Sequence, residues 1–306
     1  MVIDRLTGSH WSVLLTYLGF ILAGTPLILA RRWLRPNTGG ESAWRKYPTY
    51  ILMNLGFMAA SWLPAGWHIL ALLLALLGGL AAWEVVRALL SEKDEKLPRA
   101  LLPCATALLI AAAEWLAPVV WIKAWLFVFL LLVICNTLAG HPERYARSAL
   151  ALAGCIVYLP LCMAAYIWVR QADSSGFQAV FLYLTVGTND AFAQVTGQLF
   201  GKRPLAAHIS PGKTVEGAVG GLLFAGAMGT ALSSALGWNP IYAAILGLTI
   251  GLAGLAGDLT ESTWKRALGL KNFSALLGAH GGVLDRFDAL IFAAPVFYLL
   301  LGWAAR

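Results

Sequence analysis

The residues best suited to chemistry form one polar run near the carboxy-terminal end of an otherwise apolar chain. Asp258, Glu261 and Lys265 lie at positions i, i+3 and i+7, so they share one face if this segment is helical. Asp285 and Asp288 are also three residues apart. A carboxylate inside a membrane costs about 2.5 to 3.5 kcal/mol and normally faces water, a metal or a partner. Acids mixed with lysines and arginines therefore indicate a site that holds divalent cations and phosphates together.

The cation expected in such a site is Mg²⁺, and a second cation is left open. A hard cation is commonly held by one or two carboxylates together with substrate phosphates. Asp258, Glu261, Asp285 and Asp288 can supply the oxygen ligands. The alternative for this run is a buried salt-bridge network between its acids and its basic residues.

Asp190 is a further acid inside apolar sequence, in the run from Thr188 to Phe192. Acids at membrane depth are usually functional, so we interpret it as a ligand of a cation or a nucleotide. The alternative is an acid satisfied by a hydroxyl or amide of a neighbouring helix.

A second motif, His208 to Gly217, places a Pro-Gly turn and Lys213 directly before an apolar segment. The start of a helix offers free backbone amides and the positive end of its dipole to phosphate. The Gly-Lys-Thr of this motif resembles a Walker loop, but Ala207 stands where that loop needs glycine, and no parallel sheet is expected. A P-loop ATPase is therefore excluded, and the alternative is a helix cap with a snorkelling lysine.

Composition places the chain among polytopic membrane proteins. It has 306 residues, of which 59% are hydrophobic and 12% are charged. A helix needs about 20 apolar residues to cross the hydrocarbon core, and the charge-free stretches reach that length. We expect an all-α fold with nine to ten transmembrane helices, near residues 11–30, 47–63, 67–88, 100–117, 120–140, 148–169, 177–200, 215–236, 240–263 and 287–305.

The basic residues indicate how the chain is oriented. With ten spans and an outside amino terminus, the connections on the cytosolic side, those after the first, third, fifth, seventh and ninth spans, hold all 22 Lys and Arg residues except Arg5, Lys123, Arg170 and Arg306. The positive-inside rule then places the polar site on the cytosolic side, and we expect an integral protein of the plasma (inner) membrane. The net charge of +7 fits this topology and anionic lipid better than nucleic acid.

Two regions are expected along the chain. Residues 1–46 form an extra amino-terminal span with a basic cytosolic loop, and residues 47–306 form one membrane domain with a motif region at 180–290. The first apolar stretch is expected to remain as a helix, because no basic run precedes it and no small-residue cleavage site follows it.

Other residues have simpler expected roles. Cys104, Cys135, Cys155 and Cys162 lie singly in apolar segments without metal-ligand spacing, so we expect small core side chains. Glu84 follows a tryptophan at the expected cytosolic end of a span, where an anchor at the membrane interface is the simplest interpretation.

Together these motifs resemble the signature of phosphatidate cytidylyltransferases, also called CDP-diacylglycerol synthases. The resemblance covers about residues 180–290 and keeps the order of the family's motifs. It is carried by Asp190 with Gly197 and Gly201-Lys202, by Ser210-Pro211-Gly212-Lys213-Thr214-x-Glu216-Gly217, by Ser262-x-x-Lys265-Arg266 with Lys271, by His280-Gly281-Gly282 and by Asp285-Arg286-x-Asp288.

The resemblance implies an all-helical membrane enzyme, often a homodimer. It would join CTP to phosphatidic acid, or to a related phospholipid or phosphomonoester lipid, and release pyrophosphate. The chemistry of the residues agrees, because a phosphomonoester of about −1.5 to −2 charge can approach a triphosphate only after metals and Lys or Arg groups offset the repulsion.

The resemblance also implies roles for individual residues. The expected catalytic residues are Asp258, Lys265, Asp285 and Arg286. The expected metal ligands are Asp190, Asp258, Glu261, Asp285 and Asp288. The expected substrate-binding residues are Ser210, Lys213, Thr214, Ser262, Arg266, Lys271, His280, Gly281 and Gly282.

The chain departs from the family pattern at two places. Asn272 stands where the family usually has Asp, and Gly278-Ala279 where it usually has Pro-Gly. One anionic group is lost, which makes a divergent paralogue with another acceptor lipid an open alternative.

Two other functions are considered. A CTP-dependent polyprenol kinase would keep the fold and transfer the γ-phosphate. A secondary transporter would use Asp190, Glu216 and Asp258 as ion sites in glycine-broken helices, but the charges gather on one side and the two halves show no matching interrupted segments.

Overall fold

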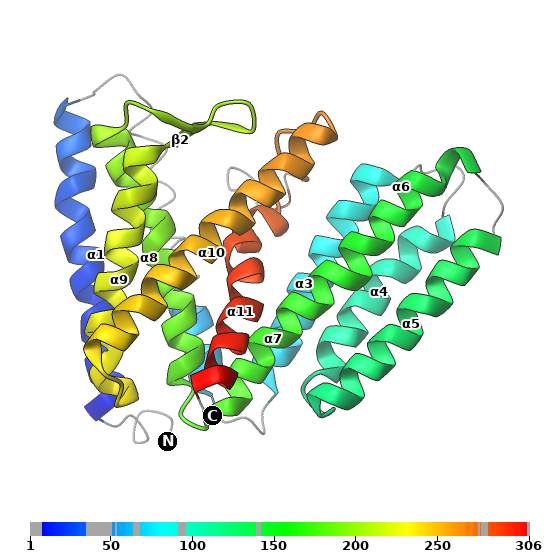
Figure 1. Cartoon of the computed structure of the whole chain (residues 1–306), viewed down its shortest axis with the longest axis horizontal. Helices are drawn as coiled ribbons and strands as arrows, with labels where there is room; N and C mark the ends of the chain where they lie inside the picture. Colours follow the sequence, from blue (N-terminus) through cyan, green and yellow to red (C-terminus); the bar gives the residue numbers. More distant parts are fainter. Residues whose placement is uncertain are drawn as a thin grey trace. The chain divides into compact units, whose positions relative to one another are not determined.

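The computed structural model describes residues 8–34, 51–52, 54–63, 68–90, 96–138, 142–274, 276 and 281–304. These residues are mostly helical, and the strands among them form a single two-stranded hairpin (Figure 1). The expected helical class is therefore confirmed, whereas the hairpin was not expected. The boundary expected at residue 46 lies outside the described residues.

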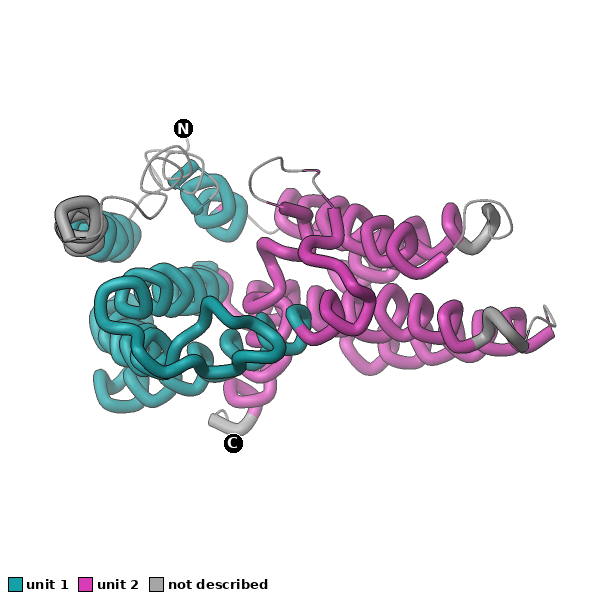
Figure 2. Tube along the Cα trace, turned by 90° about the horizontal axis from the view of Figure 1, so that it is seen from above, with its two compact units in different colours: residues 1–62, 175–262 teal, residues 63–174, 263–306 magenta. Residues whose placement is uncertain are grey.

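The chain divides into two compact units, each made of two segments (Figure 2). The first comprises Met1–Trp62 and Ser175–Ser262, and the second comprises Leu63–Ser174 and Thr263–Arg306. One helix, α10 (Pro240–Ala267), continues from the first unit into the second without a break.

The first unit contains α1 (Gly8–Leu34), α8 (Phe177–Phe200), α9 (Val215–Leu236) and most of α10; residues 54–62 are also helical. Glycines on α9 allow close packing against α8. A Cβ atom at Gly221 would lie 2.6 Å from the carbonyl oxygen of Asn189 and 2.8 Å from Cβ of Ala193. Only a residue without a side chain fits this contact, which sets the separation of the two helices.

A hairpin connects α8 to α9 in this unit. Its strands, β1 (Pro204–Ala206) and β2 (Ser210–Thr214), pair antiparallel. Thr214 caps α9 by accepting a hydrogen bond from the Gly217 amide at 3.1 Å. Glu216 accepts from the Lys202 and Arg203 amides at 3.0 and 3.2 Å. These bonds at its base hold the hairpin that carries Lys213.

The second unit contains α3 (Ile69–Leu89), α4 (Lys96–Ala112), α5 (Pro118–Leu138), α6 (Pro142–Leu152), α7 (Leu159–Ala172) and α11 (Leu284–Ala304). Its core is built from large side chains, and Trp121, Tyr166 and Phe297 are fully buried. Helix α11 packs against α7, so the start of α11 is set within this core.

A π-helix, η3 (Ala153–Tyr158), joins α6 to α7. The Thr106 hydroxyl donates to the Cys155 carbonyl at 2.6 Å, and the Trp125 indole donates to the Ile156 carbonyl at 2.5 Å. Side chains from neighbouring helices thus bond to carbonyl groups of the widened turn.

The cysteines follow the expectation only in part. All four are free thiols; Cys155 and Cys162 are buried, whereas Cys104 and Cys135 are exposed. The expectation of core positions was wrong for the latter two, because an apolar segment has an outward face as well as an inward one.

Five described helices are long and apolar enough to cross a membrane: Ile69–Leu89, Pro118–Leu138, Ala146–Ala172, Val215–Leu236 and Pro240–Ala267. This is the helix composition of a membrane protein. The described helices occupy the segments that the sequence indicates, with the span at 47–63 described only in part. The count of nine to ten spans stays a prediction.

Candidate active site

The first unit brings together four of the expected site residues. Lys213, from β2, forms an ion pair with Asp258 of α10. The Ser262 hydroxyl, one turn further along α10, lies 3.4 Å from Asp258 Oδ1. Asp190 of α8 is exposed and accepts a hydrogen bond from the Asn189 amide at 3.2 Å, and the charges of Asp258 and Lys213 act on it. Residues from three separated motifs therefore share one electrostatic environment.

The second unit holds another pair of a lysine and an aspartate. Lys265, in the last turns of α10, places Nζ 2.7 Å from Oδ1 of Asp285 in the first turn of α11. The other oxygen of Asp285 accepts from the Gly282 amide at 2.7 Å. Both side chains are largely buried, with 13% of Lys265 and 7% of Asp285 exposed. Removing one partner of such a buried ion pair lowers the stability of the folded protein, because the other charge is left buried without its partner.

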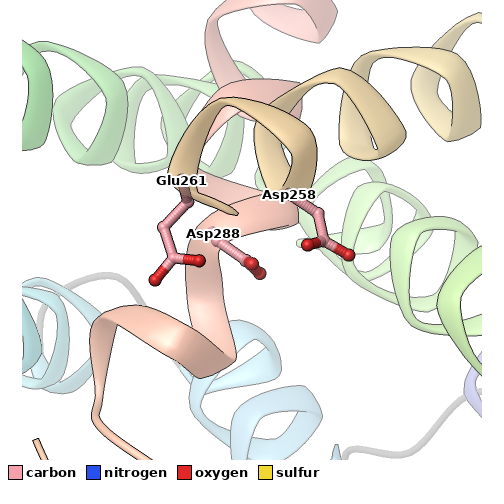
Figure 3. Close-up of side chains that lie close together, drawn as sticks. All are labelled: Asp258, Glu261 and Asp288. Carbon is pink, nitrogen blue, oxygen red and sulfur yellow. The ribbon is translucent and has the colours of Figure 1, made fainter. Parts of the chain in front are cut away.

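Three of the acids expected to bind a metal ion are shown in Figure 3: Asp258 and Glu261 belong to the first unit, and Asp288 belongs to the second. Asp258 and Glu261 are one turn apart on α10, and Asp288 comes from α11. Glu261 and Asp288 are buried, whereas Asp258 is half-buried. The Asp258 and Glu261 carboxylates, close together on one helix, suit a hard cation that also binds water and phosphate. The roles of Asp190 and Asp285 as ligands stay predictions.

Basic residues expected to bind phosphate lie near the ends of the helices. Arg266, Lys271 and Arg286 are exposed, and Arg266 donates to the Leu270 carbonyl at 3.2 Å. Ser210 is half-buried in β2. The expected role of Thr214 in substrate binding is accompanied by a structural one, since its hydroxyl caps α9. His280 lies outside the described residues.

Gly281 and Gly282, two of the expected substrate-binding residues, lie directly before α11. Both are buried, and Gly281 has φ of 81°, a conformation that favours glycine. A Cβ atom at Gly282 would lie 2.6 Å from both carboxylate oxygens of Glu84. The glycines therefore allow a close approach of the backbone to Glu84.

Glu84 was not recognised as a site residue from the sequence. Its carboxylate is fully buried and accepts three hydrogen bonds, from the Ser274 hydroxyl and the Val283 and Leu284 amides. The expectation of an anchor at the membrane interface was wrong, because an anchor would be exposed. The signal that could have found it was the acid itself, set in an apolar helix.

The fold and site define a helical membrane protein with carboxylates and lysines in its polar region. The chain belongs to the cytidylyltransferase family, whose model matches residues 45–304. It is 41% identical over 159 residues to a phosphatidate cytidylyltransferase of Aquifex aeolicus, covering 52% of this chain and 60% of that protein. A protein of the same name from Bacillus subtilis is 34% identical over 58% of this chain and 66% of its own length. Another, from Rickettsia bellii, is 27% identical over 63% of this chain and 87% of its own length.

The first of these alignments spans three fifths of that relative's length. The family membership favours nucleotidyl transfer over the polyprenol kinase and transporter alternatives.

Proposed function

We propose that this protein transfers a cytidylyl group from CTP to phosphatidic acid, giving CDP-diacylglycerol and pyrophosphate. The observation that carries the proposal is the pairing of acids with lysines, Lys213 with Asp258 and Lys265 with Asp285, within the region that matches the family. Such pairs hold carboxylates and phosphate-binding cations at the same place before any substrate arrives.

The reaction is an in-line displacement at phosphorus. An oxygen of the lipid phosphate forms a bond to the α-phosphorus of CTP, and the bond from that phosphorus to the bridging oxygen of the leaving group breaks. Pyrophosphate departs with the electron pair of that bond. No covalent intermediate with the protein is needed, so the protein acts by positioning and by charge.

Asp258, Glu261 and Asp288 are the residues proposed to hold Mg²⁺, as the resemblance to the family implies. The bound cation would supply positive charge where the two phosphate groups repel each other. Asp190 and Asp285 are proposed to assist as further ligands or by orienting water.

Lys213 and Lys265 are proposed to neutralise the triphosphate and the lipid phosphate. Each lysine forms an ion pair with an aspartate, Lys213 with Asp258 and Lys265 with Asp285, and this holds its ammonium group in place. Arg266, Lys271 and Arg286 are exposed, where they can bind phosphate oxygens as the substrates enter.

We further propose where the enzyme works and in which assembly. The site faces the cytosol from the inner membrane, as the distribution of basic residues favours, and CTP is a cytosolic nucleotide. A homodimer follows from the resemblance to the family.

The test is turnover by protein purified in detergent, with Mg²⁺, phosphatidic acid and CTP labelled in cytidine. We expect label in the lipid phase and an equal amount of pyrophosphate in the water phase. Asp258→Asn should abolish both products, and the matched variant Asp173→Asn, in the connection between α7 and α8, should keep them. Release of CDP in place of pyrophosphate would contradict the proposal.

A further inference from the structure

We propose that Glu84 is a positioning residue of the active site, whose buried carboxylate fixes the turn and the first residues of α11. The inference rests on the proposed function, because only that function gives Asp285 and Asp288 of α11 a role in catalysis. All the contacts that carry it lie within the second unit.

The contacts of Glu84 concentrate on one segment far away in sequence. Oε1 accepts from the Val283 amide at 2.8 Å, and Oε2 accepts from the Leu284 amide at 3.0 Å. The Ser274 hydroxyl donates to Oε1 at 2.5 Å. Glu84 thus binds both the beginning of α11 and the connection that precedes it.

A carboxylate suits this position for two reasons. The first amides of a helix have no partner within the helix and must be satisfied by another group. Negative charge is also favourable beside the amino-terminal end of the helix dipole. Glu84 comes from the packed helix α3 and is fully buried, so its acceptor atoms are rigidly held. An amide side chain would turn a donor toward groups that are themselves donors.

The turn is shaped to the carboxylate. At Gly282 a Cβ atom would lie 2.6 Å from both oxygens of Glu84, so any side chain at this position would push the carboxylate away. Gly282 also donates its amide to Asp285 Oδ2 at 2.7 Å. The same short segment therefore contacts Glu84 on one side and the ion-paired Asp285 on the other.

The consequence for the reaction is the placement of two acids. Asp285 lies one residue after Leu284 and Asp288 lies one turn further, so the direction of the first turn of α11 sets both carboxylates. Loss of the Glu84 contacts would leave α11 packed on α7 but would free its first turn. Residues that orient metal ligands in this way typically change affinity or activity by about 10- to 100-fold when replaced.

The first test compares Glu84→Gln with Glu114→Gln, the same chemical change in the same unit. Glu114 is also largely buried and is bonded by His68 and Gln171, so it controls for the loss of a bonded carboxylate. We expect Glu84→Gln to lower kcat by about 10- to 100-fold and to raise the Mg²⁺ concentration for half-maximal activity, with a much smaller change in the KM for CTP. Glu114→Gln should keep the wild-type kcat and Mg²⁺ dependence.

The second readout does not depend on activity. Hydrogen exchange of the Val283 and Leu284 amides should be about 10-fold faster in Glu84→Gln, whereas amides in the middle of α7 should be unchanged. If wild-type protein makes no CDP-diacylglycerol, the proposed function fails and exchange alone decides the role of Glu84. If wild-type protein is active and Glu84→Gln keeps its kcat, Mg²⁺ dependence and exchange rates, the inference about Glu84 is overturned.

Gly282→Ala provides a test should Glu84→Gln fail to fold. It disturbs the same contact from the other side and should produce the same pattern in kcat and Mg²⁺ dependence. When Glu84→Gln and Gly282→Ala are combined, the loss of kcat should be smaller than the two single effects predict together, because both changes break the same contact. Full additivity, or a normal kcat in Gly282→Ala, would overturn the inference.

Discussion

Nζ of Lys265 lies 2.7 Å from Oδ1 of Asp285, which joins the end of α10 to the first turn of α11 within one unit. The two residues are twenty positions apart in the chain and largely buried. The Lys213 pair with Asp258 is more accessible, with 22% and 31% of the side chains exposed. The two pairs should therefore differ in what they contribute to stability and to catalysis.

Lys265→Met should reduce both stability and turnover. It leaves a largely buried carboxylate at Asp285 without its cation, and we expect a loss of about 1 to 3 kcal/mol in the free energy of unfolding. Thermal unfolding in detergent measures this, with the exposed Lys123→Met on α5 as control. The double change with Asp285→Asn should cost less than the sum of the single changes. Strict additivity would contradict the coupling.

Lys213→Met should affect catalysis with little effect on stability. An accessible ion pair contributes about 0 to 1 kcal/mol, so unfolding should barely change. Loss of a charge that stabilises the transition state should lower kcat by about 100-fold or more. Steady-state rates and unfolding of the same preparation test both parts, and Lys213→Arg should recover part of the rate. Wild-type turnover in Lys213→Met would remove this residue from the site.

Glu261→Gln and Asp288→Asn should each raise the Mg²⁺ concentration needed for half-maximal activity by at least about 10-fold. The reason is that each removes one of the carboxylates proposed to hold the cation. Titration of activity with Mg²⁺ measures the effect, and removal of metal by a chelator should stop turnover reversibly. Asp190→Asn lies outside that group and should alter the Mg²⁺ requirement less. An unchanged requirement in both Glu261→Gln and Asp288→Asn would rule out this group.

Gly221→Ala should destabilise the first unit by about 1 to 3 kcal/mol, because the added methyl group would meet the backbone of α8. Turnover should fall as well, since Asn189 and Asp190 lie on the helix that must move. Gly19→Ala is the matched control: it makes the same change inside α1, where nothing lies within 4 Å of the added atom. Thermal unfolding of the two variants compares them directly. Equal stability would show that α8 and α9 can separate freely.

Much of the helical framework was predictable from local pattern, and the candidate site residues were chosen from it. Long charge-free stretches can satisfy their backbone in a membrane only as helices, and the described helices occur in those stretches. The acids Asp258, Glu261 and Asp288 stand out in the sequence because they are set among such stretches, and they are the residues proposed to hold Mg²⁺. Asp258 and Glu261 could be predicted to share one face of a helix, because residues three positions apart lie on the same side of an α-helix.

The hairpin at residues 204–214 and the role of Glu84 were not predictable in the same way. The strands are three and five residues long, too short for a recognisable alternating pattern. Glu84 contacts residues about 200 positions later in the chain, and no local pattern reports a contact at that distance. Its neighbourhood in sequence resembles that of an ordinary interface residue.

The sequence by itself determined the class of this protein, the positions of its helices and the types of residue that can bind metal and phosphate, because these depend on composition and on periods of a few residues. Only the tertiary structure decided which lysine pairs with which aspartate: Lys213 pairs with Asp258, and Lys265 pairs with Asp285. It also decided that Glu84 binds the start of α11. Those choices depend on how separate helices pack, since burial and close backbone approach at glycines such as Gly221 and Gly282 bring together residues that are distant in the chain.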